Sequence, residues 1–411
     1  MYDAIIIGAR CAGASTAMLL ARKGHKVLLV DRSAVPSDIH HGHFIHRGGP
    51  QRLDRWGVLS QIEASGCPLV TEVVMGIGGV PMTAKNIMLD GVAFGCGPRR
   101  SVLDKILVDT AVAAGVELRD QFLVEDFHSE DGAITGIVGR DLRTQRRFHE
   151  FSQIVIGADG RNSRLAKAVE APVYEAVPSV SCYYFSYWSG IANAALEFHV
   201  GKQQIIFAFP THDNLFAVFV ARPIEEFHHF RADIEKNFME ALEQAPTLAA
   251  QLQNGRREER FYGTADLPNF FRKPYGRGWA LVGDAGHHKD PYMALGIRDA
   301  LRDAELLATT VDTGLTGIRP MQTALATYEE QRNEQSRPLY YENLARAKFT
   351  PPPPELVQIR NALLHSQDQD DINHFLQVNL GLLPKESFFN PENVGRILGQ
   401  ARLETETAVM A

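Results

Sequence analysis

Residues 3–13 of this chain read Asp3-Ala-Ile-Ile-Ile-Gly-Ala-Arg-Cys-Ala-Gly13, and this stretch decides the fold. Its first half is short, apolar and rich in β-branched residues, which is typical of a parallel strand buried on both faces. Residues 14–23 then follow a helical pattern, and a second apolar strand over residues 26–30 ends at Asp31. A strand, a glycine turn, a helix and a carboxylate about 20 residues beyond the turn are typical of the start of a dinucleotide-binding fold.

The turn offers several groups to a ligand that carries phosphates. Gly8 permits a tight exit from the strand, and Gly13 lets the helix pack closely on the sheet. The helix N-terminus then faces a pyrophosphate, and Asp31 accepts hydrogen bonds from ribose hydroxyls. Arg10 stands where the middle glycine is usual, so its guanidinium points away from the phosphates or turns onto them. An α/β turn without a nucleotide is the alternative on this stretch alone. The ligand contacts expected from this segment are Gly8, Arg10, Cys11, Ala12, Gly13, Asp31 and Arg32.

Composition narrows the class of protein. The chain has 411 residues and a net charge of −7, which favours two or three globular domains and argues against a nucleic-acid partner. Its four cysteines lie far apart without a C-x-x-C pair, so neither a disulfide framework nor a zinc site is indicated, and no metal is expected. We find no charged leader and no apolar stretch long enough to cross a bilayer. These features predict a soluble cytoplasmic protein without a membrane span.

Two stretches have a different pattern, in which short β-type runs dominate. Residues 68–97 are broken by glycines, and residues 179–222 contain hairpin-connected, antiparallel strands that a helix from about residue 224 to residue 244 covers on one side. One aromatic face of these strands packs on the helix and the other faces a pocket, with Tyr184 and Phe209 as expected wall residues. The sequence leaves open which face is which.

The remaining segments return to the α/β pattern. Buried strands end in the glycine turns Gly157-Ala-Asp-Gly160 and Val282-Gly-Asp-Ala285, and helices are expected over residues 295–311 and 324–345. The predicted fold class is α/β: a Rossmann-like domain with a parallel sheet, interleaved with an antiparallel-sheet substrate domain and followed by a C-terminal helical extension. The expected boundaries are 1–67, 98–172 and 273–345 for the Rossmann-like domain, 68–97 and 173–272 for the substrate domain, and 346–411 for the extension.

Three separated motifs stand in one order along the chain: Gly8 to Gly13 with Asp31, Gly157 to Gly160, and Val282 to Ala285 with Pro291 and Gly296. Together they resemble the family of FAD-dependent monooxygenases typified by p-hydroxybenzoate hydroxylase, whose relatives include geranylgeranyl-reductase-like proteins and flavin halogenases. The resemblance covers about residues 1–345. It implies that the Rossmann-like domain binds FAD.

The resemblance also implies roles for single residues. Arg100 matches an arginine that reaches the FAD phosphates and the ribityl chain. Asp159 lies in the family's Asp-Gly motif, which supports FAD and is associated with a nicotinamide reductant. Asp284 matches a carboxylate that accepts hydrogen bonds from the ribityl hydroxyls, and residues 291–296 match a turn and helix N-terminus beside the pyrimidine edge of the flavin. The further implied contacts are Gly160, Gly283, Gly296 and Ile297.

Two departures from the family pattern lie beside that turn. Ala294 stands where a glycine is usual and Arg298 where an asparagine is usual, so we expect the ring to be held, or to swing, differently. A free helix N-terminus there stabilises the negative charge of reduced flavin. The extension after about Phe349 is less typical of the family, and we expect a lid or a dimer surface there.

The reaction implied by the resemblance is a hydroxylation. NADH or NADPH reduces FAD, the flavin takes up oxygen at its C4a carbon, and the resulting hydroperoxide transfers one oxygen atom to an organic, aromatic small molecule. The protein positions the substrate and excludes water. A histidine beside the ring relays protons near neutral pH, with ordinary loop hydrogen bonding as the alternative. The residues expected around the ring are His46, His287, His288, Pro291 and Leu295.

His46 also belongs to a cluster with His40, His41 and His43. A metal site is one interpretation of this cluster, but no neighbouring cysteine or carboxylate pattern supports it. Hydrogen-bond donors beside a cofactor ring, or plain loop histidines, are favoured.

Three alternative functions are weighed against hydroxylation. An FAD-dependent reductase or dehydrogenase of the geranylgeranyl-reductase-like type uses the same fold without oxygen insertion. A non-catalytic flavin sensor is never reduced by NADH or NADPH. Halogenation is disfavoured because residues 206–210 lack the tryptophan motif of that branch, although Lys85 is an echo of its reactive lysine. The sequence leaves open the substrate, the choice between NADH and NADPH, whether a separate flavin reductase supplies reduced FAD, and whether the chain is a monomer or a homodimer.

Overall fold

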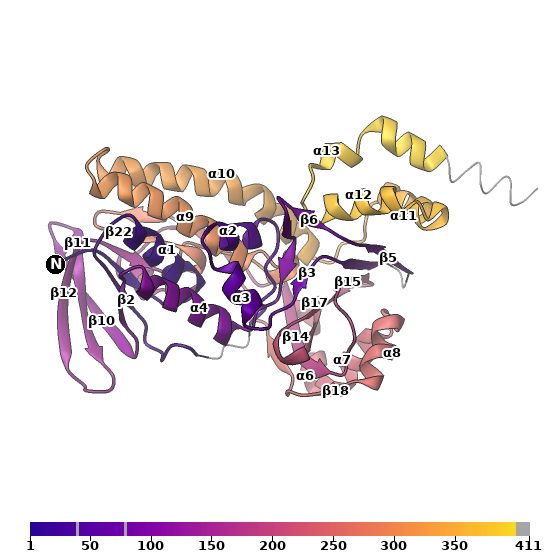
Figure 1. Ribbon diagram of the computed structural model, residues 1–411, viewed down its shortest axis with the longest axis horizontal. Helices are drawn as coiled ribbons and strands as arrows, with labels where there is room; N and C mark the ends of the chain where they lie inside the picture. The colour runs from indigo at the N-terminus through magenta and orange to yellow at the C-terminus, as the bar shows by residue number, and fades with distance from the viewer. Residues whose placement is uncertain (38–40, 78–79, 400–411) are drawn as a thin grey trace, which may run out of the picture. The chain divides into compact units, whose positions relative to one another are not determined.

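The computed structural model describes residues 1–37, 41–77 and 80–399. The chain forms two compact units, whose elements are labelled in Figure 1. The first unit comprises Met1–Cys67, Pro98–Val180 and Asp266–Leu344, and the second comprises Pro68–Gly97, Ser181–Ala265 and the chain from Ala345 onward. Each unit therefore consists of segments that lie far apart in the sequence.

A mainly parallel sheet forms the centre of the first unit, with the strand order β10-β11-β12-β1-β2-β9 and with β22 beside β12. Ile5 of β1 pairs with Leu28 on one side and Val155 on the other, and all three side chains are fully buried. The antiparallel strands β10 and β11 are joined by a tight turn at Asp131 and Gly132. The strands are β1 (Tyr2–Ile7), β2 (Val27–Val30), β9 (Glu117–Arg119), β10 (Phe122–Glu130), β11 (Ala133–Asp141), β12 (Arg147–Gly157), β21 (Tyr275–Gly276) and β22 (Trp279–Leu281).

Helix α1 packs against both α4 and α9. Ala14, Ala17 and Met18 of α1 are fully buried, so mostly small side chains fill these contacts. The helices of this unit are α1 (Cys11–Arg22), α2 (Gly49–Arg55), α3 (Leu59–Ala64), α4 (Arg100–Ala113), α5 (Arg164–Ala168), α9 (Gly296–Leu315) and α10 (Met321–Ala347), whose last residues belong to the second unit. A second sheet of this unit consists of β13 (Val173–Val177), β20 (Asn269–Arg272) and β23 (His287–His288).

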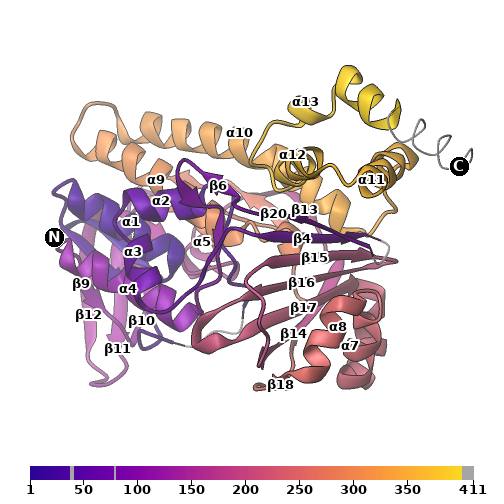
Figure 2. The same cartoon turned by 45° about the vertical axis from the view of Figure 1, so that its right-hand side comes forward.

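The second unit is built on a sheet with the order β18-β14-β17-β16-β15-β4-β5, in which β19 also pairs with β14 (Figure 2). Its pairs are antiparallel except for β15 and β4, which run parallel. The strands are β4 (Val73–Ile77), β5 (Val80–Ala84), β14 (Ser181–Ser189), β15 (Leu196–Gly201), β16 (Gln204–Pro210), β17 (Phe216–Pro223), β18 (Arg256–Arg257) and β19 (Tyr262–Thr264). Two short pairs also belong to this unit: β3 (Leu69–Val70) with β8 (Gly95–Cys96), and β6 (Met88–Leu89) with β7 (Val92–Ala93).

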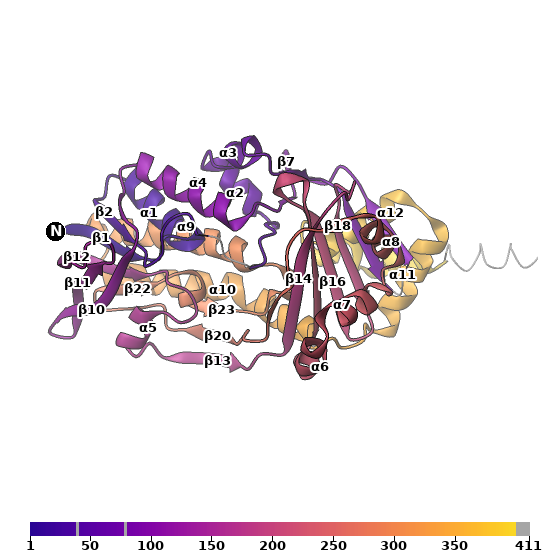
Figure 3. The same ribbon diagram turned by 90° about the horizontal axis from the view of Figure 1, so that it is seen from below.

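The two faces of this sheet differ in what covers them within the unit. Helices α6 (Phe227–Ala232), α7 (Ile234–Leu242) and α8 (Pro246–Asn254) lie along one face (Figure 3). That face forms a buried core from Cys182, Tyr184, Trp188, Ile206, Val218, Phe230, Phe238 and Leu242. The opposite face carries Phe185, Phe207 and Phe219, and the ring centroids of Phe185 and Phe219 lie 4.6 Å apart. The structure thus resolves which aromatic face packs on helices.

The covering helix differs from the single helix expected over residues 224–244. The chain forms a 3₁₀ turn, Ile224–Glu226, and is then broken at Asp233 between α6 and α7. Asp233 has φ of −148°, and its side chain accepts a hydrogen bond from Lys236 N over 3.2 Å. Aspartate is favoured at such a cap over a helix interior because its side chain satisfies a free N–H group.

The C-terminal helices α11 (Pro354–Ser366), α12 (Gln369–Asn379) and α13 (Lys385–Phe388) belong to the second unit. Helix α12 lies against β5, where Gln369 Nε2 donates to Thr83 O over 2.8 Å. None of the helices in the described part of the chain is long and apolar enough to cross a membrane.

Candidate functional site

The carboxyl ends of four parallel strands, β2, β1, β12 and β22, meet at one edge of the sheet in the first unit. Backbone hydrogen bonds hold these ends together: Gly8 N donates to Val30 O over 2.7 Å, and Ala158 N donates to Ile7 O over 2.8 Å. Ligands of open α/β sheets bind at this edge. The three sequence motifs therefore form one site, although they lie far apart in the chain.

Three glycines at this edge have no room for a side chain. Gly8 has φ of +105°, and a Cβ there would lie 2.5 Å from Ala158 O. A Cβ on Gly13 would lie 1.8 Å from Gly8 O. A Cβ on Gly283 would lie 2.8 Å from the Cβ of Ala12. The first turn of α1 thus packs directly on the ends of the neighbouring strands.

Two guanidinium groups lie near the N-terminus of α1. Arg10 is the N-cap residue and adopts an extended conformation (φ −103°, ψ −166°), so this position does not need the usual glycine. Arg100 begins α4, and its Nη2 lies 3.0 and 3.1 Å from the two carboxylate oxygens of Asp104, whose Oδ1 also accepts from Cys11 Sγ over 3.4 Å. Burial lowers the pKa of Arg10. The carboxylate of Asp31 raises this pKa and the guanidinium of Arg100 lowers it, because both charged groups lie near Arg10. Cations beside a helix N-terminus favour an anionic ligand.

Asp31 and Asp284 follow β2 and β22. Asp31 holds the turn, because its carboxylate accepts from Ala9 N and from Ser33 N, each over 2.8 Å. Arg32 is exposed beside it. Asp284 is exposed although its neighbours in the chain on both sides are buried, which leaves its carboxylate accessible to a ligand.

Asp159, after β12, has a buried acceptor without a donor. Its Oδ2 accepts from Arg164 N over 2.7 Å, whereas its Oδ1 is buried and has no hydrogen-bond partner among the described residues. Burial raises the pKa of this carboxyl. Gly160 follows with φ of +78°, and a Cβ there would meet nothing within 4 Å. Buried polar atoms are normally satisfied, so Oδ1 is placed to receive a donor from a ligand.

His46 offers a second buried acceptor. Its Nε2 lies 2.8 Å from Met293 O, and because a carbonyl only accepts, we infer that Nε2 carries the proton. Nδ1 is then an acceptor, and it is buried without a partner in the described part of the chain. Burial, with a smaller contribution from Arg47, lowers the pKa of His46 to about 3, so the ring is neutral near pH 7. His40, of the same predicted cluster, lies outside the described residues, which hold no group of three histidine, cysteine or carboxylate side chains placed to bind a metal.

The turn before α9 is held from one side. Asn343 Oδ1 accepts from Met293 N over 2.9 Å, and Asn343 Nδ2 donates to Asp290 O over 2.8 Å. Ala294 has φ of +50°, a region that costs a residue with a Cβ about 1 kcal/mol relative to glycine. Gly296 begins α9, and a Cβ there would meet nothing within 4 Å, so the helix N-terminus opens onto free space. The same segment contains Pro291, Leu295 and Ile297.

The comparison with protein families decides the class of ligand. A model described as FAD binding domain matches residues 1–340. This chain belongs to the FAD-binding family. The match confirms the family that the three motifs predicted, that of FAD-dependent monooxygenases with geranylgeranyl-reductase-like relatives. The chain is therefore an FAD-dependent oxidoreductase.

Several known proteins are similar over most of the chain. The digeranylgeranylglycerophospholipid reductase of Methanothrix thermoacetophila is 22% identical, covering 93% of this chain and 97% of the reductase. Among solved structures, the flavin-dependent brominase Bmp2 has a TM-score of 0.75 at 17% identity, covering 99% of each chain. PqsL, a probable FAD-dependent monooxygenase from Pseudomonas aeruginosa, has a TM-score of 0.69 at 19% identity, covering 91% of this chain and 98% of PqsL. These likenesses confirm the predicted α/β fold class with its FAD-binding domain.

The residues at the strand ends fit FAD. Its phosphates are acceptors, which suit Arg10, Arg100 and the N-terminus of α1. The ribityl hydroxyls and the ring of FAD also carry hydrogen-bond donors. Within the described chain, the buried acceptors Asp159 Oδ1 and His46 Nδ1 have no donor. A polar group that the protein leaves without a partner is thus matched by a group that the cofactor brings.

Two other predicted histidines are held by packing inside the first unit. The ring of His287 stacks on Phe271, with centroids 5.2 Å apart, and its Nδ1 lies 3.3 Å from Asp303 Oδ2. Burial lowers the pKa of His287. His288 Nδ1 is hydrogen-bonded to Pro268 O. We therefore propose His46, and neither of these two, as the histidine that contacts the flavin ring.

The two expected pocket-wall residues lie on opposite faces of the sheet in the second unit. Tyr184 packs under the helices, where its hydroxyl donates to Phe227 O over 3.2 Å and its ring stacks on Phe230 at 4.4 Å. Phe209 lies on the other face, where its ring stacks on Phe219 at 5.7 Å. Tyr184 therefore serves the core under the helices. Phe209 is fully buried as well, and it stays the proposed wall residue because it lies on the face opposite α6, α7 and α8.

The sequence reasoning missed a buried ion network on α9. Lys289 Nζ contacts Asp299 Oδ2, and Arg302 Nη1 donates to Asp299 Oδ1 over 3.0 Å. Arg302 Nη2 donates to Asp303 Oδ1 over 2.6 Å, and Arg298 Nη1 donates to Asp299 Oδ1 over 2.7 Å. Three cations against two carboxylates leave one net positive charge near the N-terminus of α9. The sequence feature that could have predicted this network is the charged run over residues 298–303. Its charged residues occupy helix positions that an amphipathic helix turns towards a core.

Proposed function

We propose that this chain is an FAD-dependent monooxygenase that takes electrons from NADH or NADPH and transfers one oxygen atom to a small aromatic molecule. The observation that carries the proposal is the buried, neutral His46 bonded to the turn that precedes α9. With Nε2–H donated to Met293 O and a pKa of about 3, His46 has no proton to give near pH 7. Such a dry, non-acidic surrounding suits oxygen transfer, because stray protons and water divert activated oxygen to hydrogen peroxide.

FAD, when bound, supplies electron uptake and oxygen activation. In this proposal Arg10, Arg100 and the N-terminus of α1 bind its phosphates, and Asp31 orients the adenosine ribose. Asp159 and Asp284 hold ribityl hydroxyls with their free carboxylate oxygens. The N-terminus of α9, reinforced by the positive ion network, stabilises negative charge on the reduced ring.

The face of the second unit's sheet opposite α6, α7 and α8 supports an aromatic substrate. Phe198 lies 5.0 Å from Phe207, and Phe209 lies 5.7 Å from Phe219, measured between ring centroids. Phe185 continues this array on the other side of Phe219. Aromatic rings favour offset or edge contacts with one another, so this face is suited to recognise a flat aromatic molecule.

Oxygen uptake, NADH and NADPH oxidation and peroxide release, measured with the FAD-loaded protein across phenols and polyketide-like aromatics, test the proposal. A substrate that speeds oxidation of the reductant, lowers peroxide release and gains one labelled atom from labelled oxygen gas supports it. Adding a separate flavin reductase distinguishes direct reduction from supplied reduced FAD. A product that gains or loses hydrogen without labelled oxygen overturns the proposal.

A second candidate is an FAD-dependent reductase of the geranylgeranyl-reductase-like type. It is favoured by the similarity to the Methanothrix reductase over nearly the whole of both chains. Hydrogenation of a prenyl lipid by the reduced protein without oxygen would support it. The same incubation separates the two functions, since a monooxygenase forms no product without oxygen.

A further inference from the structure

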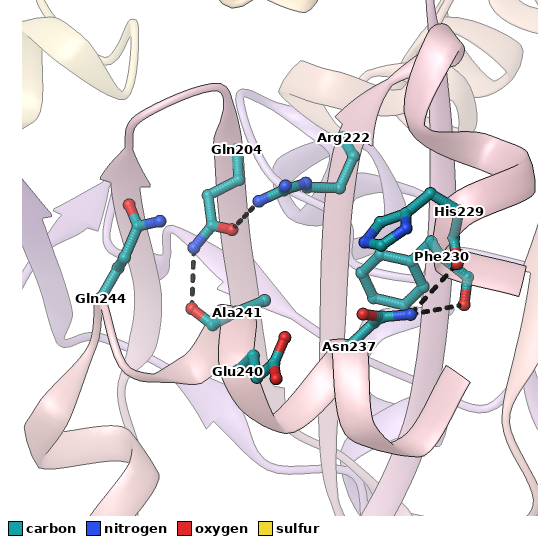
Figure 4. Close-up of a pocket in the computed structure, with 8 residues that line it drawn as sticks. All are labelled: Gln204, Arg222, His229, Phe230, Asn237, Glu240, Ala241 and Gln244. Carbon is teal, nitrogen blue, oxygen red and sulfur yellow. Dashed lines mark hydrogen bonds between the residues drawn. The ribbon is translucent and has the colours of Figure 1, made fainter. Parts of the chain in front are cut away.

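We propose that the second unit contains a binding site for a small zwitterion of the α-amino-acid class, in a pocket between β16, β17, α6 and α7. Figure 4 shows the residues that line it: Gln204, Arg222, His229, Phe230, Asn237, Glu240, Ala241 and Gln244. The cavity volume is about 110 Å³. This is well below the range of about 300–1,000 Å³ for small-molecule sites, so only a very small ligand fits. All eight residues belong to the second unit, and none belongs to the FAD motifs.

Gln204 fixes the guanidinium of Arg222 at one side of the pocket. Gln204 is fully buried, and its Nε2 donates to Ala241 O over 2.7 Å. Its Oε1 accepts from Arg222 Nη1 over 2.6 Å, as the dashed lines in Figure 4 show. Because each end of the amide has a partner, the guanidinium is held in one orientation.

This side of the pocket carries unused donors. Arg222 Nε is buried and has no partner among the described residues, and Arg222 Nη2 lies 3.7 Å from Glu226 Oε2, too far for a hydrogen bond. Beyond Gln204, on the far side from Arg222 in Figure 4, Gln244 Oε1 accepts from Lys202 N over 2.9 Å, which leaves the amide NH₂ of Gln244 as a second donor to the pocket. A buried charged donor without an acceptor is costly, and a carboxylate is the group that satisfies a guanidinium best.

The opposite side of the pocket carries acceptors. Asn237 Nδ2 donates to His229 O over 3.1 Å and to Phe230 O over 3.3 Å, which leaves Asn237 Oδ1 as an acceptor. The carboxylate of Glu240 lies on the same side in Figure 4, where its Oε1 is 3.7 Å from Lys236 Nζ, too far for a hydrogen bond. An ammonium group facing these oxygens and a carboxylate facing Arg222 are the two ends of an α-amino acid. Phe230 provides an apolar wall for a small side chain.

Calorimetric titration of the full chain with the twenty common amino acids, and with acetate and methylammonium as single-charge probes, tests this site. We expect saturable binding of at least one small amino acid, about tenfold tighter than either probe. Arg222→Lys keeps the charge but removes the Nε donor, and should weaken binding about tenfold. Glu240 is exposed, and Glu240→Gln should weaken amino-acid binding several-fold. Arg231→Lys, on the exposed side of α6, is the matched control and should bind as the wild type does.

Three outcomes would overturn the assignment. The first is that no amino acid binds saturably, and the second is that acetate binds as tightly as the best amino acid. The third is that Arg222→Lys and Glu240→Gln both bind with wild-type affinity. Circular dichroism establishes that each variant is folded before titration. If Arg222→Lys does not fold, the Glu240→Gln result decides, because an exposed carboxylate can be neutralised without disturbing the core.

Discussion

The Nε2 atom of His46 lies 2.8 Å from the carbonyl oxygen of Met293, although 247 positions separate the two residues in the sequence. The contact joins the loop before α2 to the turn before α9. It also settles the chemistry of the imidazole, because a ring that donates from Nε2 presents only a lone pair at Nδ1. A histidine that is expected to relay protons is thereby a neutral acceptor.

Acid should destabilise the protein through His46. Burial lowers the pKa of His46 to about 3 in the folded chain, against about 6.5 in the unfolded chain. Between these values the unfolded chain binds a proton that the folded chain does not, so stability falls as the pH falls from 6.5 towards 3. Lowering the pH from 7 to 5 should cost about 2 kcal/mol of unfolding free energy through this group. Between pH 7 and pH 5, the unfolding free energy of His46→Gln, measured by urea unfolding, should therefore fall by about 2 kcal/mol less than that of the wild type.

The exposed His149 provides the control for that measurement. His149→Gln should keep the wild-type pH dependence of the unfolding free energy. An equal loss of stability between pH 7 and pH 5 in the wild type and in His46→Gln would show that burial does not hold His46 neutral.

Replacing Gly13 or Gly296 by alanine should have very different effects on stability. A Cβ on Gly13 would lie 1.8 Å from the backbone oxygen of Gly8, so Gly13→Ala should lower the unfolding free energy by more than about 3 kcal/mol. A Cβ on Gly296 would meet nothing within 4 Å, so Gly296→Ala should change stability by less than about 1 kcal/mol. The added methyl should still weaken FAD binding about tenfold if the flavin edge occupies that space. Thermal unfolding and flavin fluorescence titration measure the two effects, and full FAD affinity in Gly296→Ala would contradict the placement.

Asp159→Asn should separate folding from cofactor binding. Burial raises the pKa of Asp159, and its Oδ1 has no donor in the described chain, so removing the charge should leave the stability of the FAD-free protein unchanged or raise it. Loss of the charged acceptor should weaken FAD binding about tenfold. The control is Asp109→Asn, an exposed carboxylate paired with Lys105, which should bind FAD normally. Wild-type FAD affinity in Asp159→Asn would remove this residue from the site.

Arg298→Asn should lower the flavin reduction potential. Arg298 bonds Asp299 Oδ1 over 2.7 Å and Arg47 O over 3.2 Å, and its loss removes the net positive charge of the network on α9. The anionic reduced ring is then less stabilised, and the affinity for sulfite, which also places negative charge on the ring, should fall about fivefold. Potentiometric titration and sulfite binding measure this, with Arg319→Asn on the exposed loop after α9 as the control. An unchanged or higher potential would show that this charge does not act on the flavin.

Local patterns in the sequence were sufficient to predict the elements around the site. The strand expected over residues 3–7 is β1 (Tyr2–Ile7), and the helices expected over residues 295–311 and 324–345 are α9 (Gly296–Leu315) and α10 (Met321–Ala347). The order of the three glycine turns also sufficed to predict the FAD-binding family. These predictions depend on the spacing of apolar residues and on the backbone freedom of glycine, which each short segment carries within itself.

Only the tertiary structure decided which distant groups meet. The pairing of β12 and β22 beside β1 brings Asp159 and Asp284 to the turn at Gly8. Tyr184 and its neighbour Phe185 lie on opposite faces of the sheet, and three helices pack on the face that carries Tyr184. Burial and a carbonyl from another loop make His46 neutral. Such outcomes depend on burial and on contacts between remote segments, and no single stretch of sequence contains that information.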